Sequence, residues 1–156
     1  MNASVNIRKA KIEDCPAIQE LVVGLAIFEK APEQVTSTIA DLEKWGFGKQ
    51  PLFEAFVAEM DNKIVVFALL YWKYSTWKGR TLFLEDFFVD ENYRQFGIGK
   101  QLFLKGVELA NANKCERMEW LVLDWNEIGL NFYNKVGATI DTEWNSGMLF
   151  KNDFKR

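Results

Sequence analysis

Histidine is absent from the 156 residues of this sequence, and its absence removes several kinds of active site. Paired Ser-His and Cys-His nucleophiles are excluded, as are metal sites built on imidazole ligands. Acid–base chemistry must therefore be carried out by Glu, Asp, Tyr, Lys or Cys side chains.

Cysteine is scarce, and the sequence has neither an excess of positive charge nor a long apolar run. Cys15 and Cys115 fit no metal or redox spacing, so we expect a reduced, cytoplasmic setting and no bound metal. A formal charge of −3 argues against nucleic acid as a partner. The first residues lack the apolar core of a signal peptide, and no apolar run is long enough to span a bilayer, so a membrane is not an expected partner either.

The sequence that remains is 49% apolar and 15% aromatic, without repeats or linkers, which predicts a single domain over residues 1–156. Asp14 is a candidate N-cap for a first helix, and Thr38 with Asp41 resembles a capping box for a second helix that stops near Gly46. The predicted strands cover residues 4–9, 53–59, 64–72, 81–89 and 118–123, with later helices at 98–113 and 126–136 and a final strand or hairpin at about 138–151. The order β-α-α-β-β-β-α-β-α-β predicts an α+β fold, a mixed central sheet flanked by helices.

The segment Arg94-Gln95-Phe96-Gly97-Ile98-Gly99 lies between a predicted strand and a predicted helix. Glycines there allow tight turning and a close approach of backbone N–H groups to a ligand, and a helix N-terminus favours anions. Neither a Walker A loop nor a dinucleotide fingerprint matches, because Gln101 and Leu102 stand where those motifs need Ser/Thr and glycine. Two glycines alone mark a turn more often than a phosphate site, but the strand–loop–helix context favours a pyrophosphate.

Two carboxylates, Glu85 and Asp86, interrupt an apolar predicted strand. In a regular strand they face opposite sides, each beside large apolar residues. One interpretation is structural, with each carboxylate paired to Lys or Arg at a sheet end. The other is a desolvated base in a cleft at the strand end.

Aminolysis of a thioester is a reaction that these residues could catalyse. The attacking amine must be neutral, and the departing thiolate benefits from a proton. Glu85, directly or through a water, is the best candidate for the first task, and Tyr133 for the second. The alternative for Tyr133 is an amphipathic core tyrosine.

These segments resemble the GCN5-related N-acetyltransferase (GNAT) superfamily, whose phosphate loop has the form Gln/Arg-x-x-Gly-x-Gly/Ala. Longer segments are similar to its spermidine/spermine (diamine) acetyltransferase branch: Leu84-Glu85-Asp86-Phe87-Phe88-Val89, Trp125-Asn126-Glu127 and Asn131-Phe132-Tyr133. The segment from Tyr74 to Thr81 is instead similar to the thialysine N-epsilon-acetyltransferase paralogue.

The resemblance implies an acetyl-CoA-dependent N-acetyltransferase acting on a small cationic amine, either a thialysine-like amino acid or a diamine or polyamine. Glu85 would assist deprotonation of the amine, and Tyr133 would be the general acid. The residues implied to bind acetyl-CoA are Phe87, Phe88, Val89, Arg94, Gln95, Phe96, Gly97, Ile98, Gly99, Lys100, Asn126 and Tyr133. Those implied to line the amine site are Phe28, Glu29, Ser75, Thr76, Trp77, Glu85, Asp86, Glu119, Trp120 and Leu121.

Three departures from the polyamine enzyme bear on the acceptor. Ser75 and Thr76 replace an acidic residue and a proline, which should weaken binding of a long polycation. Phe28 replaces a tyrosine and removes a hydroxyl. Glu119 replaces a histidine and adds a carboxylate that should attract a cation.

Two other functions stay open at this point. One is acetylation of a protein lysine or N-terminus, and the other is a non-catalytic acyl-CoA-binding module. The resemblance also implies a homodimer.

Overall fold

The computed structural model describes residues 4–154, so the ends of the predicted domain, residues 1–3 and 155–156, lie outside the described residues. The chain forms two compact units, one running to Leu121 and the other starting at Val122. No helix in residues 4–154 has both the length and the apolar character needed to cross a membrane.

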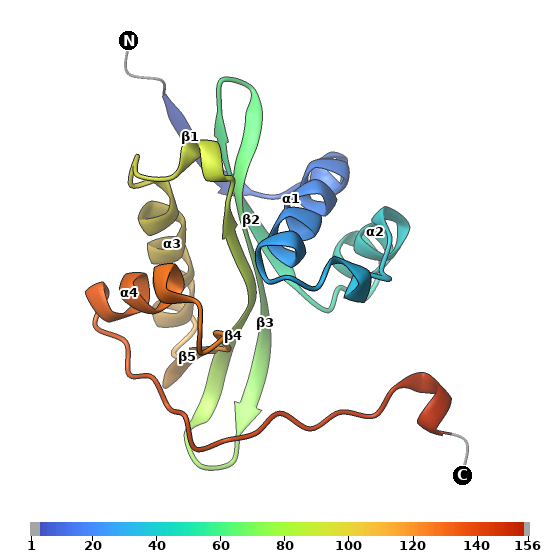
Figure 1. Ribbon diagram of the computed structural model, residues 1–156, viewed down its shortest axis with the longest axis vertical. Coiled ribbons are helices and arrows are strands. Elements are labelled where there is room, and N and C mark those ends of the chain that lie inside the picture. The colour runs from blue at the N-terminus through green and yellow to red at the C-terminus, as the bar shows by residue number, and fades with distance from the viewer. Residues whose placement is uncertain (1–3, 155–156) are drawn as a thin grey trace. The chain divides into compact units, whose positions relative to one another are not determined.

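The first unit is built on a five-stranded sheet in the order β1-β2-β3-β4-β5 (Figure 1). Neighbouring strands are antiparallel from β1 to β4, and β4 with β5 is parallel, so the sheet is mixed as predicted. The strands are β1 (Val5–Lys9), β2 (Glu54–Met60), β3 (Lys63–Ser75), β4 (Gly79–Val89) and β5 (Arg117–Trp120).

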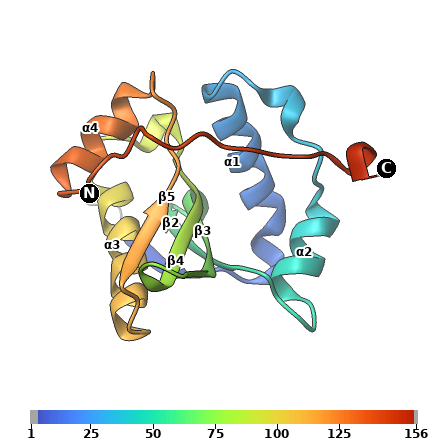
Figure 2. The ribbon, with the colours of Figure 1, turned by 90° about the horizontal axis from the view of Figure 1, so that it is seen from below.

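Helices cover both faces of this sheet (Figure 2). On one face, α1 (Cys15–Phe28) buries Ile18 and Leu21 in a core with Val57 and Phe67, beside α2 (Ile39–Phe47). On the other face lies α3 (Ile98–Ala112), where a Cβ added at Gly106 would lie 3.3 Å from a methyl group of Leu70. Each full burial of such an apolar side chain contributes about 1.5–3 kcal/mol, so these two layers hold the unit together.

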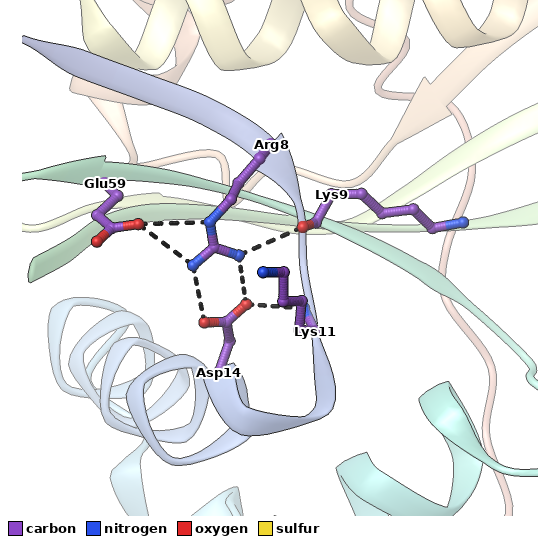
Figure 3. Close-up of polar contacts among 5 residues, drawn as sticks. All are labelled: Arg8, Lys9, Lys11, Asp14 and Glu59. Atoms are coloured by element: carbon purple, nitrogen blue, oxygen red, sulfur yellow. Dashed lines mark hydrogen bonds and ion pairs between the residues drawn. The ribbon is translucent and has the colours of Figure 1, made fainter. Parts of the chain in front are cut away.

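An ion-pair network connects the start of α1 to the sheet (Figure 3). Arg8 on β1 lies 2.6 Å from an Asp14 oxygen and 3.3 Å from a Glu59 oxygen on β2. Asp14 also accepts a hydrogen bond from the Lys11 amide at 2.7 Å, and the Arg8 guanidinium holds the pKa of Asp14 below its ordinary value. Asp14 is the N-cap residue as predicted, but its carboxylate binds Arg8 and Lys11 and does not cap the helix.

Other local predictions are confirmed. The Thr38 side-chain oxygen accepts a hydrogen bond from the Asp41 amide, and the Asp41 carboxylate accepts one from the Thr38 amide, which completes the predicted capping box. The turn between β2 and β3 places Asp61 and Asn62 at positive φ, as a tight hairpin requires.

The second unit contains α4 (Glu127–Lys135), followed by Gly137 at φ 82° and a short 3-10 helix, Lys151–Phe154. The predicted final strand or hairpin at about 138–151 is wrong: residues 138–150 are extended and form no strand in the described chain. A strand needs a neighbouring edge to take its hydrogen bonds, and none of the described strands pairs with this segment.

Candidate functional site

A β-bulge lies at Glu85. Adjacent β3 residues Leu69 and Leu70 are opposite Asp86 and Leu84, so Glu85 is an extra residue with no partner in the register. Bulges bend a strand and re-aim its side chains, and they are frequent beside active sites. The expectation that Glu85 and Asp86 simply alternate in a regular strand is therefore wrong.

The bulge moves Asp86 to the sheet face shared by Leu69 and Tyr71 on β3. Asp86 is partly buried there, and burial, followed by the charges of Glu85 and Glu29, raises its pKa to about 6. Glu85 itself is exposed, so the desolvated carboxyl group of this pair is Asp86. The sequence alone left the desolvated role open between Glu85 and Asp86 and proposed Glu85 as the group that deprotonates the amine.

Glu29, the C-cap residue of α1, brings a third carboxylate toward Asp86. Burial raises the pKa of Glu29 as well. The charges of Glu85 and Glu29 contribute to the raised pKa of Asp86, and a bound cation would offset them, since an opposite charge favours the ionised form of a carboxyl group.

Beyond the bulge, β4 loses its partner on one side. β5 is paired with β4 only at residues 81–84 and ends at Trp120. Among the described strands, none pairs with residues 85–89 on that edge. The backbone of Phe87, Phe88 and Val89 therefore presents a strand edge that can take an extended ligand.

The loop after β4 is shaped by positive backbone angles. Gln95 has φ 75°, and Gly97 has φ 72° and is the N-cap residue of α3. Gly97 has no side chain to cap the first helical amides, so those donors are left for another acceptor. A Cβ on Gly99 would lie 2.9 Å from a Val89 methyl carbon, which explains a glycine at this close approach.

Arg94 is engaged within the protein. Its Nε donates to the Val89 carbonyl oxygen at 3.3 Å, and its guanidinium lies 5.2 Å from the Phe28 ring and 5.6 Å from the Phe88 ring. The side chain thus joins the loop to α1 and β4. Ile98 is buried, while Phe96 and Lys100 are not.

Glu119 is opposite Phe83 and is already ion-paired. The Lys73 ammonium donates to Glu119 Oε1, and an Arg117 guanidinium nitrogen lies 2.7 Å from Oε2. The expectation that Glu119 adds a carboxylate free to attract a cation is therefore corrected. Sequence reasoning missed Lys73 and Arg117, although each lies two residues from a site residue along its strand.

The hairpin tip between β3 and β4 holds Ser75, Thr76 and Trp77. Ser75 Oγ accepts hydrogen bonds from the amides of Trp77 and Lys78 at 3.2 and 3.1 Å, and Trp77 is 80% exposed. Six residues of β4 separate the tip from Glu85, about 20 Å of strand. The structure does not bring these three predicted site residues to the carboxylates.

Two further predicted site residues lie at the end of β5 and just after it. The Trp120 ring packs edge-on against Phe103 of α3, 5.5 Å between centroids, and thus lies on the opposite face of the sheet. Leu121 follows β5 and is exposed.

Asn126 and Tyr133 belong to the second unit. Asn126 caps α4, its side-chain oxygen accepting from the Gly129 amide at 2.9 Å. Tyr133 is 8% exposed, and its ring packs edge-on against Phe132 with centroids 5.5 Å apart. In residues 4–154 no group of three or more His, Cys, Asp or Glu side chains could hold a metal ion.

Comparison with known proteins gives a consistent result. The acetyltransferase (GNAT) family model matches residues 17–138. A mouse thialysine N-epsilon-acetyltransferase is 37% identical over 157 residues, covering 96% of this chain and 92% of the mouse protein. A human spermidine/spermine N(1)-acetyltransferase-like protein 1 is 37% identical over 85% of this chain, which spans only 20% of the human protein's length. An integron cassette protein from V. cholerae has a similar fold, with a TM-score of 0.78 at 21% identity over 97% of this chain and 95% of that one.

Proposed function

This chain belongs to the acetyltransferase (GNAT) family and transfers an acetyl group to an amine, and we propose that the acceptor is a small cationic molecule and the donor acetyl-CoA. The carrying observation is the bulge at Glu85. At the bulge, Glu85 and Asp86 lie close enough to Glu29 for their charges to interact. The unpaired edge of β4 follows the bulge along the chain, and the start of α3, which no side chain caps, comes after it.

In this proposal the donor lies along β4 and the loop. Backbone groups of Phe87, Phe88 and Val89 bind the pantetheine arm as an added strand would. The amides of residues 95–100 hold the pyrophosphate, where the helix dipole favours negative charge. Asn126 flanks the cofactor from the start of α4.

The chemistry divides between two side chains. Glu85, exposed at the bulge, accepts a proton from the substrate ammonium, directly or through a water, because only a neutral amine can attack. The amine nitrogen then forms a bond to the acetyl carbonyl carbon, and the C–S bond breaks. The nitrogen releases its remaining extra proton to solvent as the amide forms, while Tyr133 gives its proton to the departing thiolate and recovers one from solvent. Asp86 and Glu29 attract the ammonium, since a bound cation offsets the cost of ionising buried carboxyl groups.

We also propose that the whole chain acts as one acetyltransferase domain in a reduced, cytoplasmic setting. The family match runs from residue 17 to 138 and so includes parts of both units. Cys15 and Cys115 are both free thiols.

A homodimer is the proposed assembly. The sequence predicts a strand or hairpin at about 138–151, yet residues 138–150 form no strand in the described chain. Three large apolar side chains of this segment are exposed: Trp144, Met148 and Phe150. An edge strand of a second copy would supply the missing hydrogen bonds.

Light scattering of the purified protein should give a mass near twice 18.1 kDa. Trp144→Ser should lower the dimer fraction, and a monomeric wild type would contradict the proposal.

An amine panel tests the acetyl-transfer proposal. Purified protein with acetyl-CoA should release free CoA faster with thialysine or a polyamine than with a lysine-containing peptide. Gly97→Glu serves as the cofactor-site control, because a carboxylate in the loop repels the pyrophosphate; it should bind CoA at least about tenfold more weakly, which corresponds to ~1.4 kcal/mol. Faster release with the peptide would favour a protein substrate. CoA binding without turnover on any amine would favour a non-catalytic module.

A further inference from the structure

We propose that Lys73 and Arg117 form a carboxylate-binding subsite that selects acceptors carrying an acid group at the end opposite the reacting amine. An amino acid with a side-chain amine is such a molecule, whereas a polyamine is not. This inference rests on the proposed function, because the reacting amine must lie at the carboxylates near the bulge.

The two cations lie on one face of the sheet. Lys73 on β3 and Arg117 on β5 are both opposite Thr81 of β4, one from each side. Residues opposite one another share a face, and so do residues two apart on one strand. Phe83, Tyr71 and Glu119 therefore lie on the same face, and the bulge places Asp86 there too.

The charge of this cluster is positive. Glu119 is the only carboxylate with an ion pair to either Lys73 or Arg117 in residues 4–154, so two cations share one anion. The Lys73 and Arg117 side chains are 40% and 38% exposed, which leaves both able to contact a solute. A guanidinium suits a carboxylate because its planar donors match the two oxygens.

The spacing suits a short aliphatic chain. The Lys73 ammonium lies 5.4 Å from the centroid of the Phe83 ring, and Phe83 precedes Glu85 by two residues, about 7 Å of strand. Between the two charged ends, the rings of Tyr71 and Phe83 lie 5.0 Å apart; Phe83 is only 8% exposed, so the partly exposed Tyr71 ring provides the apolar contact for methylene groups or a thioether sulfur. The order along this face is carboxylates, aromatic rings, then cations.

This polarity discriminates between acceptor classes. An amino acid with a terminal amine would place its ammonium at Asp86 and its carboxylate at Lys73 and Arg117. The α-ammonium of the amino acid is accompanied by that carboxylate, whereas a diamine of equal length would place an ammonium alone against the same two cations, and like charges repel. The hairpin-tip residues Ser75 and Thr76 are not needed for this selection.

A matched pair of substrates tests the subsite. Thialysine and bis(2-aminoethyl) sulfide share the reacting amine, the thioether and the chain, and only thialysine has the carboxylate. Wild-type kcat/KM should be higher for thialysine, and Lys73→Met should lower the thialysine-to-sulfide ratio of kcat/KM by about tenfold, chiefly through KM. Arg117→Gln should act in the same direction. Lys78→Met, an exposed lysine at the hairpin, is the matched control and should leave the ratio unchanged.

Glu119→Gln is an independent test, because it should change the thialysine-to-sulfide ratio of kcat/KM in the opposite direction. It frees both cations from their shared anion, so the ratio should rise even if the Lys73 variant folds poorly. Equal wild-type rates for the two compounds, or a ratio that neither Lys73→Met nor Glu119→Gln moves, would overturn the subsite while leaving acetyl transfer intact. No turnover of either compound, or of any other amine, would overturn the proposed function on which the subsite depends.

Discussion

Replacing Tyr133 with phenylalanine should lower kcat for acetyl transfer by at least about ten- to a hundredfold, since a positioned general acid contributes roughly 10²–10⁴. Phenylalanine keeps the ring that is buried and packed against Phe132, and removes only the hydroxyl group. The loss should therefore appear in kcat while the affinity for CoA and the melting temperature change little. Stopped-flow detection of CoA release in a single turnover measures the chemical step without product release.

The control is Tyr74→Phe, which removes the hydroxyl of an exposed tyrosine near the hairpin tip and should leave the rate unchanged. If Tyr133→Phe retains the wild-type single-turnover rate, Tyr133 is a core residue and another donor protonates the thiolate. If Tyr133→Phe lowers both the rate and the melting temperature by a large amount, the hydroxyl group has a structural role.

Asp86→Asn should stabilise the protein at neutral pH by about 3 kcal/mol, the equivalent of moving a carboxyl pKa from 3.8 to about 6. The amide keeps the shape of the side chain without the cost of ionising it in a partly buried site. The same substitution should weaken binding of a cationic acceptor. Stability would thus rise while activity falls, a known cost of destabilised functional sites.

The pH dependence of this effect has a definite sign. Below about pH 4 Asp86 is protonated in both the folded and the unfolded chain, so wild type and variant should be equally stable there. Between about pH 4 and 6 the folded protein holds a proton that the unfolded chain releases, and wild-type stability falls as pH rises. Above that window the difference is constant and largest.

Urea unfolding of both proteins at several pH values measures this difference, and the comparison cancels the titration of groups such as Asp14 that both proteins share. Glu85→Gln is the control; it removes only one contribution to the raised pKa of Asp86 and should stabilise less. A difference independent of pH, or a less stable variant at pH 7, would mean that Asp86 has a charged partner.

Features set by nearby residues were accessible from the sequence. The Thr38–Asp41 capping box, the turn at Asp61 and the start of α3 at Gly97 each depend on contacts within a few residues. The loop at residues 94–99 belongs to the same class, since positive φ at Gly97 and the close approach at Gly99 are needs that glycine meets. These local signals also carried the resemblance to the GNAT family.

Features set by strand register were not accessible. The bulge at Glu85 exists only in relation to Leu69 and Leu70 on β3, and a strand pattern of period two cannot reveal it. The pairing of Glu119 with Lys73 and Arg117 joins residues of β3 and β5, and Lys73 and Glu119 are 46 residues apart in the sequence. The segment at about 138–151 shows the converse, because a strand or hairpin was predicted there and none of the described strands pairs with it.

By itself, the sequence determined the kind of chemistry. A chain without histidine, with a phosphate-type loop between strand and helix and two carboxylates in the strand before it, is compatible with acyl transfer, and the resemblance of these segments to the GNAT family identified that chemistry. Tertiary structure alone decided which carboxyl group is desolvated, which charges are free and which side of the sheet each one faces. Burial and charge pairing depend on neighbours brought together by the sheet, so only the structure assigns the desolvated role to Asp86 and pairs Glu119 with Lys73 and Arg117.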